Sequence, residues 1–181
     1  MLASRSPQRR AILEQIGVEF DVEVPDVEEL DAGPPHEVAL ENAFRKASAV
    51  AARLPGELIV GVDTLVSLGA RLYGKPADEE QARTMLSALS GRRHTVVSGI
   101  CVITDGSART AAASTAVEFR ALDATLIEWY VASGEWRERA GAYAIQGRGA
   151  ALVAGIEGDF LNVVGLPVTT LLELAPGLLS G

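Results

Sequence analysis

The sequence predicts an α/β protein with a mixed β-sheet, and three observations carry this prediction. Helical and strand-like patterns are interleaved along the chain, and Asp105-Gly106 between two strand-like segments predicts a hairpin in the middle. Apolar residues make up 48% of the 181 residues, enough for a full hydrophobic core. Because a hairpin pairs two strands antiparallel, which a purely parallel doubly wound sheet does not contain, the sheet should be mixed. The length fits one domain over residues 1–181, undivided or with a cleft between two lobes.

The N-terminal third predicts a short strand at residues 1–3 and then a helix. Ser6 is a typical helix cap, Pro7 suits the first helical position, and Gly17 closes the helix. Apolar residues alternate with acidic ones over residues 19–24, which predicts a half-buried strand. An acidic loop, 25–35, precedes a long helix over about 35–53.

The later elements follow from the same signals. We expect a strand over 58–62 leading into Asp63, a hairpin over 65–72 that turns at Gly69, a helix over 78–89, strands over 95–104 and 110–120, a helix over 124–133, a strand over 150–156 and a last helix over 167–174. Residues 134–149 are rich in glycine and give no clear pattern.

Charge and composition exclude several classes of protein. Sixteen basic residues against 24 acidic ones give a net charge of −8, which argues against a nucleic-acid polymer or an anionic membrane as partner. A single cysteine, Cys101, forms no internal disulfide and no cysteine-based zinc cluster. The start lacks the apolar core of a signal peptide, and no run approaches the ~18 apolar residues of a membrane helix. We therefore expect a cytoplasmic protein.

The two lysines, Lys46 and Lys75, stand out among fourteen arginines. In a chain that otherwise uses arginine, a lysine suggests a need for a compact ammonium that a planar guanidinium does not replace. This observation selects both residues before any motif is considered.

Two acidic or basic clusters near the N-terminus are candidates for binding. Residues 6–10 combine a helix N-terminus with a hydroxyl and two arginines, which suits a phosphate group, although an ordinary cap with solvated arginines would look the same. Asp26, Glu28 and Glu29 offer the oxygen ligands that Mg²⁺ takes, with a solvated acidic loop as the alternative.

Two further segments could carry chemistry. Asp63 follows an apolar strand, the end at which open α/β sheets place ligands, so it could ligate a metal or act as a base; a simple Asx turn is the alternative. Residues 140–149 are small enough for close backbone approach, and Gln146 could read a base edge, unless the segment is only a flexible loop. We interpret the isolated His36 and His94 as structural, and the sequence lacks a phosphate-loop or dinucleotide-binding motif.

Together these segments resemble the Maf family of nucleoside triphosphate pyrophosphatases, whose motifs they match in order along nearly the whole chain. The matching blocks are Leu2–Arg9, Gly61–Thr64, Gly74–Pro76, Leu89–His94, Ser133–Glu135, Ala140–Gly147 and Val163–Pro167. The resemblance implies an elongated α/β fold with a mixed sheet and a cleft between two lobes, shared with the inosine-triphosphate pyrophosphatases. It also implies cleavage between the α- and β-phosphates, a divalent cation (Mg²⁺ or Mn²⁺) and a homodimer.

The resemblance assigns roles to individual residues. Asp63 matches the catalytic acid/base, Lys46 and Lys75 the phosphate-site lysines, and Ser6 and Arg9 the N-terminal phosphate motif. It further implies that Asp63 holds the metal with Glu28 or Glu29, and that Thr64 and Gln146 influence base preference.

The sequence departs from the family pattern at three places. Gln8 stands where an arginine is usual, at a position tied to substrate preference; Trp136, Glu138 and Arg139 replace a proline and an Asp-Lys pair; and Ala144 replaces a glycine. Ile145-Gln146-Gly147 is typical of the branch that prefers dTTP and UTP, including modified pyrimidines. The expected role is nucleotide-pool housekeeping. The alternatives are a nucleotide-binding regulator of cell division and an inosine/xanthosine triphosphate pyrophosphatase.

Overall fold

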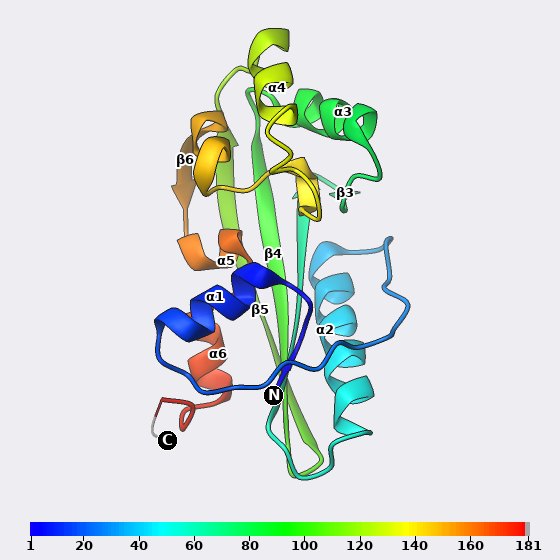
Figure 1. The fold of residues 1–181 in the computed structure, drawn as a ribbon. Coiled ribbons are helices and arrows are strands. Elements are labelled where there is room, and N and C mark those ends of the chain that lie inside the picture. Colours follow the sequence, from blue (N-terminus) through cyan, green and yellow to red (C-terminus); the bar gives the residue numbers. More distant parts are fainter. Residues whose placement is uncertain (180–181) are drawn as a thin grey trace. The chain divides into compact units, whose positions relative to one another are not determined.

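The computed structural model describes residues 1–179 and confirms the mixed α/β class (Figure 1). Six strands form one sheet in the order β1-β2-β4-β5-β6, with β3 paired to β2. The β1–β2 pair is parallel, whereas β2–β3 and β5–β6 are antiparallel. The chain divides into two compact units: unit 1 holds Met1–Thr64, Ser98–Ala113 and the chain from Gly165, and unit 2 holds Leu65–Val97 and Ser114–Val164.

Three long strands contribute residues to both units. They are β2 (Ile59–Leu68), β4 (Arg93–Thr104) and β5 (Ser107–Phe119). The predicted turn between β4 and β5 is present, with Asp105 and Gly106 both at positive φ (50° and 74°). Two successive left-handed residues are the conformation that a tight two-residue hairpin requires.

Unit 1 also contains β1 (Leu2–Ala3) and helices α1 (Pro7–Gln15), α2 (Pro35–Ala51) and α6 (Val168–Leu174). Figure 1 shows α2 on one side of the unit's strands and α1 and α6 on the other. Helix α2 packs unusually close, because Gly61 of β2 and Gly99 of β4 have no side chain. A Cβ at Gly61 would lie 2.8 Å from the Ala47 Cβ, and one at Gly99 would lie 2.6 Å from the Leu40 backbone nitrogen.

Unit 2 adds β3 (Arg71–Tyr73), α3 (Glu79–Leu89), α4 (Ala124–Val131), two 3₁₀ turns (Ala140–Ala142 and Gly147–Leu152), β6 (Val153–Glu157) and α5 (Phe160–Val164). Its core is aromatic: the rings of His94, Phe119 and Tyr143 meet edge to face, with centroids 4.7–5.5 Å apart. His94 Nε2 and the Tyr143 hydroxyl are hydrogen-bonded at 2.9 Å, so these two atoms satisfy each other inside the core. The buried His94 Nδ1 has no hydrogen-bond partner among the described residues. This supports the structural interpretation of His94.

Two sequence-based expectations about strands are wrong. Residues 19–24 form no strand; a single bridge joins Val22 to Leu2, and the Val22 and Val24 side chains are 39% and 42% exposed. The alternation was present, but this segment lacks a second partner that would bury its apolar face. Asp63 does not follow its strand, because β2 continues through it to Leu68.

Smaller differences concern element ends and one missed helix. Helix α6 starts at Val168. The glycine-rich segment that gave no prediction contains the first 3₁₀ turn and the start of the second, which continues to Leu152, so β6 starts only at Val153. The short helix α5 follows an Asp159 cap that we did not recognise in the sequence.

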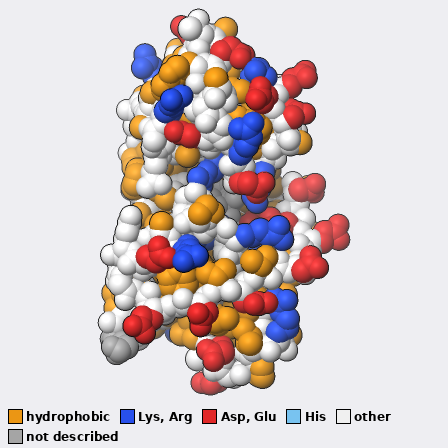
Figure 2. Space-filling model, viewed as in Figure 1, with side chains coloured by type: hydrophobic (Ala, Val, Ile, Leu, Met, Phe, Trp, Pro, Cys, Tyr) orange, Lys and Arg blue, Asp and Glu red, His pale blue; other side chains and the backbone are white. Residues whose placement is uncertain are grey.

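The surface carries both signs of charge. Figure 2 shows acidic and basic side chains interspersed on the face turned to the viewer, rather than a continuous basic patch there. Among residues 1–179, no helix has both the length and the apolar character needed to cross a bilayer.

Candidate active site

Asp63 is the centre of a buried polar cluster in unit 1. It lies within β2, and its side chain is 6% exposed. Each carboxylate oxygen has its own donor from α2: Lys46 Nζ lies 2.6 Å from Oδ1, and Asn42 Nδ2 donates to Oδ2 at 3.0 Å. A buried carboxylate without such partners would be strongly unfavourable, so α2 makes the ionised form tenable here.

The acidic loop reaches the same cluster through Glu29. Its Oε1 lies 2.9 Å from Lys46 Nζ, so a single ammonium joins two carboxylates, one from the loop and one from β2. Asn42 reinforces the arrangement, because its side chain also binds the backbone of Leu30. The loop is thus attached to the buried face of α2 through Glu29 and Leu30.

Glu28 and Glu29 differ in what they contact. Glu28 contacts α2 through its backbone carbonyl, which accepts a hydrogen bond from Arg45 Nη1 at 3.3 Å. Of the two acidic residues that the sequence left as alternatives, only Glu29 is joined to Asp63 through Lys46 in this structure.

Arg9 and Thr64 form a second buried network in unit 1. The guanidinium donates from Nε to the Gly165 carbonyl at 2.8 Å, from Nη1 to Ser4 Oγ at 3.0 Å and from Nη2 to Thr64 Oγ1 at 3.0 Å. Burial lowers the pKa of Arg9, and the charges of Asp63 and Glu29 partly offset this effect. Since a guanidinium has five N–H donors, it can brace Thr64 and still offer donors to an anion.

The first turn of α1 is organised as the sequence predicted. The Arg9 amide donates to Ser6 Oγ at 3.4 Å, which makes Ser6 the N-cap, and Pro7 is the first helical residue. The Ser6 hydroxyl in turn donates to Gln8 Oε1 at 3.2 Å. Gln8 therefore accepts from the capping serine, whereas the arginine usual at this position has no acceptor to offer.

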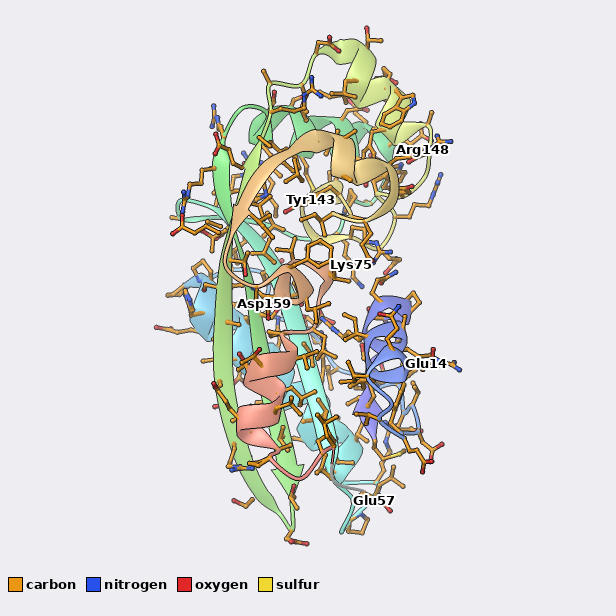
Figure 3. The ribbon with its side chains drawn as sticks, turned by 90° about the vertical axis from the view of Figure 1, so that its left-hand side faces the viewer. Glu14, Glu57, Lys75, Tyr143, Arg148 and Asp159 are labelled. Carbon is orange, nitrogen blue, oxygen red and sulfur yellow. The ribbon has the colours of Figure 1, made fainter. Side chains whose placement is uncertain are left out.

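Lys75 and Gln146 belong to unit 2, and both are exposed. Lys75 Nζ lies 2.9 Å from Glu138 Oε2, in an ion pair whose side chains are 54% and 80% exposed. Lys75 is labelled in Figure 3. The backbone near Lys75 is anchored, because the Gly141 amide donates to the Gly74 carbonyl at 3.0 Å. The anchor fixes where the lysine leaves the chain, while its long side chain stays in solvent.

Gln146 starts a turn that Glu135 holds in place. The Glu135 carboxylate accepts from the amides of Arg148 and Gly149 at 3.1 and 3.2 Å. Gly147, with φ of 64°, lies against this carboxylate so closely that a Cβ would be 2.8 Å from Oε1. Two of the matched blocks, Ser133–Glu135 and Ala140–Gly147, are thus parts of one local structure.

A divalent cation fits the donor chemistry around Asp63. In the described part of the chain, no group of three or more His, Cys, Asp or Glu residues could hold a metal by itself. Mg²⁺, however, is commonly held by one or two carboxylates together with substrate phosphates and water. Asp63 and Glu29 are two carboxylates that already share one positive group, the Lys46 ammonium.

The sequence did not single out the neutral polar residues of the two networks, which are Asn42 beside Asp63 and Ser4 and Ser98 beside Arg9 and Thr64. Ser98 Oγ is 2.9 Å from Thr64 Oγ1, and Asn42 is completely buried. A signal for Asn42 was available, because it lies four residues before Lys46 on the stripe of α2 that is otherwise Ala39, Ala43, Ala47 and Val50.

The family profile and the curated relatives agree on one family. Three curated relatives are named "dTTP/UTP pyrophosphatase": those of Symbiobacterium thermophilum (46% identity, 93% of this chain, 88% of the relative), Pyrococcus furiosus (44%, 96%, 92%) and Sphingopyxis alaskensis (49%, 93%, 90%). A solved structure of the Staphylococcus aureus Ham1 protein aligns over 65% of this chain and 70% of its own, with 19% identity and a TM-score of 0.48. The sequence profile of the Maf-like proteins matches residues 1–177. The chain therefore belongs to the Maf family.

Proposed function

We propose that this protein hydrolyses dTTP and UTP to the monophosphate and pyrophosphate, as a housekeeping enzyme of the nucleotide pool. The class of enzyme predicted from the sequence, a nucleoside triphosphate pyrophosphatase, is confirmed by the names of its relatives. The observation that carries the proposal is the cluster in which the buried Lys46 ammonium lies between the buried Asp63 carboxylate and the half-exposed Glu29 carboxylate, because these groups suit chemistry on an anionic substrate with a cation.

Asp63 is the proposed catalytic residue. Its carboxylate is held by Lys46 and Asn42, so its orientation is fixed before substrate binds. In that orientation it would position a water molecule, and accept its proton, as the water attacks the α-phosphorus. The bond to the bridging oxygen then breaks, and pyrophosphate leaves. A fixed base removes the cost of orienting the water during the reaction.

Cationic and amide groups would hold the triphosphate. In unit 1 these are Arg9, Lys46 and the amides that follow Ser6, at a helix N-terminus where phosphate oxygens are favoured. We retain Lys75 for the phosphates and Thr64, Gln146 and Gln8 for base preference, on the strength of the family match. Lys46 is the pivotal group, because an anionic substrate would compete with Asp63 and Glu29 for its ammonium.

Asp63 and Glu29 are the proposed ligands of Mg²⁺ or Mn²⁺, with Glu28 as the weaker candidate. When bound, the cation supplies charge neutralisation for the phosphates and the leaving group. The Asp63 and Glu29 carboxylates would then bind the cation in place of the Lys46 ammonium.

The experiment that tests this function is a panel of triphosphates assayed for pyrophosphate release. The panel should contain the common and modified pyrimidine triphosphates, GTP, ITP and XTP, each with Mg²⁺ and with Mn²⁺, and Asp63→Asn protein as the blank. We expect dTTP and UTP to give the highest kcat/KM. Preference for ITP or XTP would favour the purine alternative, and nucleotide binding without turnover would favour a regulator of cell division.

A further inference from the structure

Asn42 is a fully buried polar residue in the middle of α2 with every hydrogen-bonding group engaged. Its carbonyl oxygen accepts from the Leu30 amide at 2.7 Å, and its Nδ2 donates to the Leu30 carbonyl and to Asp63 Oδ2, both at 3.0 Å. A primary amide has one acceptor group and two N–H donors, so this environment uses the whole group. A carboxylate in its place would lack both donors.

Asn42 and Lys46 make parallel connections. They are four residues apart on α2 and so lie on the same face of the helix. Each joins one oxygen of Asp63 to one residue of the acidic loop: Lys46 joins Oδ1 to Glu29, and Asn42 joins Oδ2 to Leu30. Two neighbouring side chains of α2 thus fix the position of the loop relative to the Asp63 carboxylate.

The two connections differ in what can displace them. Lys46 is charged, and an anionic substrate or a cation at the carboxylates competes for its partners. Asn42 is neutral and is saturated by one carboxylate oxygen and one backbone peptide, so neither a phosphate nor a metal offers it a better partner. Buried hydrogen bonds of this kind are costly to leave unmade, which favours their persistence through a catalytic cycle.

We propose that Asn42 is a positioning residue that keeps Asp63 oriented and the acidic loop attached to it while Lys46 changes partners. This inference rests on the proposed function for its catalytic consequence, and on the hydrogen bonds alone for its structural one. Asn42 touches neither water nor substrate in this role; it acts through Asp63 and through the loop that carries Glu29.

Two substitutions separate the parts of this role. Asn42→Leu keeps the approximate volume and removes all three hydrogen bonds; we expect kcat for dTTP to fall at least tenfold while KM changes less than threefold. Asn42→Asp keeps the shape and places a second carboxylate against Asp63; we expect a fall of about 10²-fold at pH 7.

The split between kcat and KM distinguishes positioning of Asp63 from a loss of substrate binding, because Asn42 contacts Asp63 and Leu30 and no phosphate-binding cation. An Asn42→Leu variant in which KM rises at least as much as kcat falls would overturn the proposal.

Hydrogen exchange of the Leu30 amide tests the attachment of the loop without any substrate. In the wild type this amide should be protected, and in Asn42→Leu it should exchange at least tenfold faster, while Glu37→Gln on the exposed side of α2 leaves it unchanged. Unchanged exchange, or a kcat within twofold of wild type, would overturn the inference. If Asn42→Leu does not fold, Asn42→Ser serves in both measurements. A wild type that releases no pyrophosphate would count against the proposed function, whereas the exchange result would still decide whether Asn42 holds the loop.

Discussion

The two units bury polar groups in different ways. Unit 1 buries charged groups: the side chains of Lys46 and Asp63 are only 9% and 6% exposed, and their opposite charges are paired. Unit 2 buries neutral polar groups, such as His94 with Tyr143, and leaves its candidate Lys75 in an exposed pair with Glu138. Exposed ion pairs contribute little, whereas breaking a buried pair leaves an uncompensated charge. Chemistry that needs a fixed charge is therefore better served by unit 1.

The sharpest test of this difference is Asp63→Asn. The change keeps the shape and removes the charge that we propose to accept a proton and to attract a cation, so we expect kcat to fall about 10³-fold, or about 4 kcal/mol in the activation free energy. Pyrophosphate release with dTTP measures it. Asp105→Asn in the β4–β5 turn is the matched control, since asparagine tolerates the left-handed backbone there. A variant that retained most activity would move the catalytic role away from unit 1.

The neutral core of unit 2 predicts a loss of stability in acid. Burial lowers the pKa of His94 to about 4, with the backbone of Arg92 partly opposing the shift. Because the folded protein disfavours the protonated ring, its stabilisation is complete above pH 6.5 and is lost as the pH falls toward 4, by about 3 kcal/mol. Urea unfolding at pH values from 7 to 4 measures the loss. The slope should be smaller in His94→Gln and unchanged in His36→Gln; equal slopes in all three proteins would contradict the assignment.

The two lysines let the units be compared with one chemical change. Lys46→Arg places a longer, planar group between two carboxylates in a buried space, and we expect kcat/KM to fall by up to 10²-fold. Lys75→Arg lies in solvent but is aimed by the anchored turn at Gly74, so we expect a fall of about tenfold. Arg53→Lys, in an exposed pair with Glu23, is the control that should change nothing. If Lys75→Arg stays within twofold of wild type, the rarity of lysine was no guide to function in unit 2.

The smallest expected effect is a change of substrate preference in Gln8→Arg. Gln8 Oε1 accepts from the Ser6 hydroxyl, and an arginine would release that hydroxyl and add a fixed charge. We expect kcat/KM for dTTP and UTP to rise about threefold relative to the purine triphosphates, on the scale of less than 1 kcal/mol. The triphosphate panel reads this directly. An unchanged ranking would show that position 8 does not face the nucleotide.

Local signals in the sequence were sufficient for most of the fold. The Ser6 cap and the Asp105-Gly106 turn both appear where expected, because each depends on residues within four positions. The rarity of lysine also singled out Lys46, and the structure places its buried ammonium 2.6 Å from Asp63 Oδ1 and 2.9 Å from Glu29 Oε1.

What the sequence left unpredicted depends on distant partners. Whether residues 19–24 become a strand is decided by available neighbours, and only the one bridge to Leu2 forms. The choice between Glu28 and Glu29 is decided by which side chain meets Lys46, seventeen or eighteen residues later in the chain. Asn42 looks like an ordinary helix residue until β2 and the acidic loop are both placed against it.

The contact of α2 with Gly61 and Gly99 also determines which mutations the enzyme would tolerate. A methyl group at either glycine would meet the backbone of α2 and push the helix that carries Asn42 and Lys46 away from the sheet that carries Asp63. A random-mutagenesis screen for lost activity would therefore recover Gly61 and Gly99 together with the proposed catalytic residue. Saturation mutagenesis scored by activity should find that neither position tolerates substitution, so engineering of this enzyme should leave both glycines unaltered.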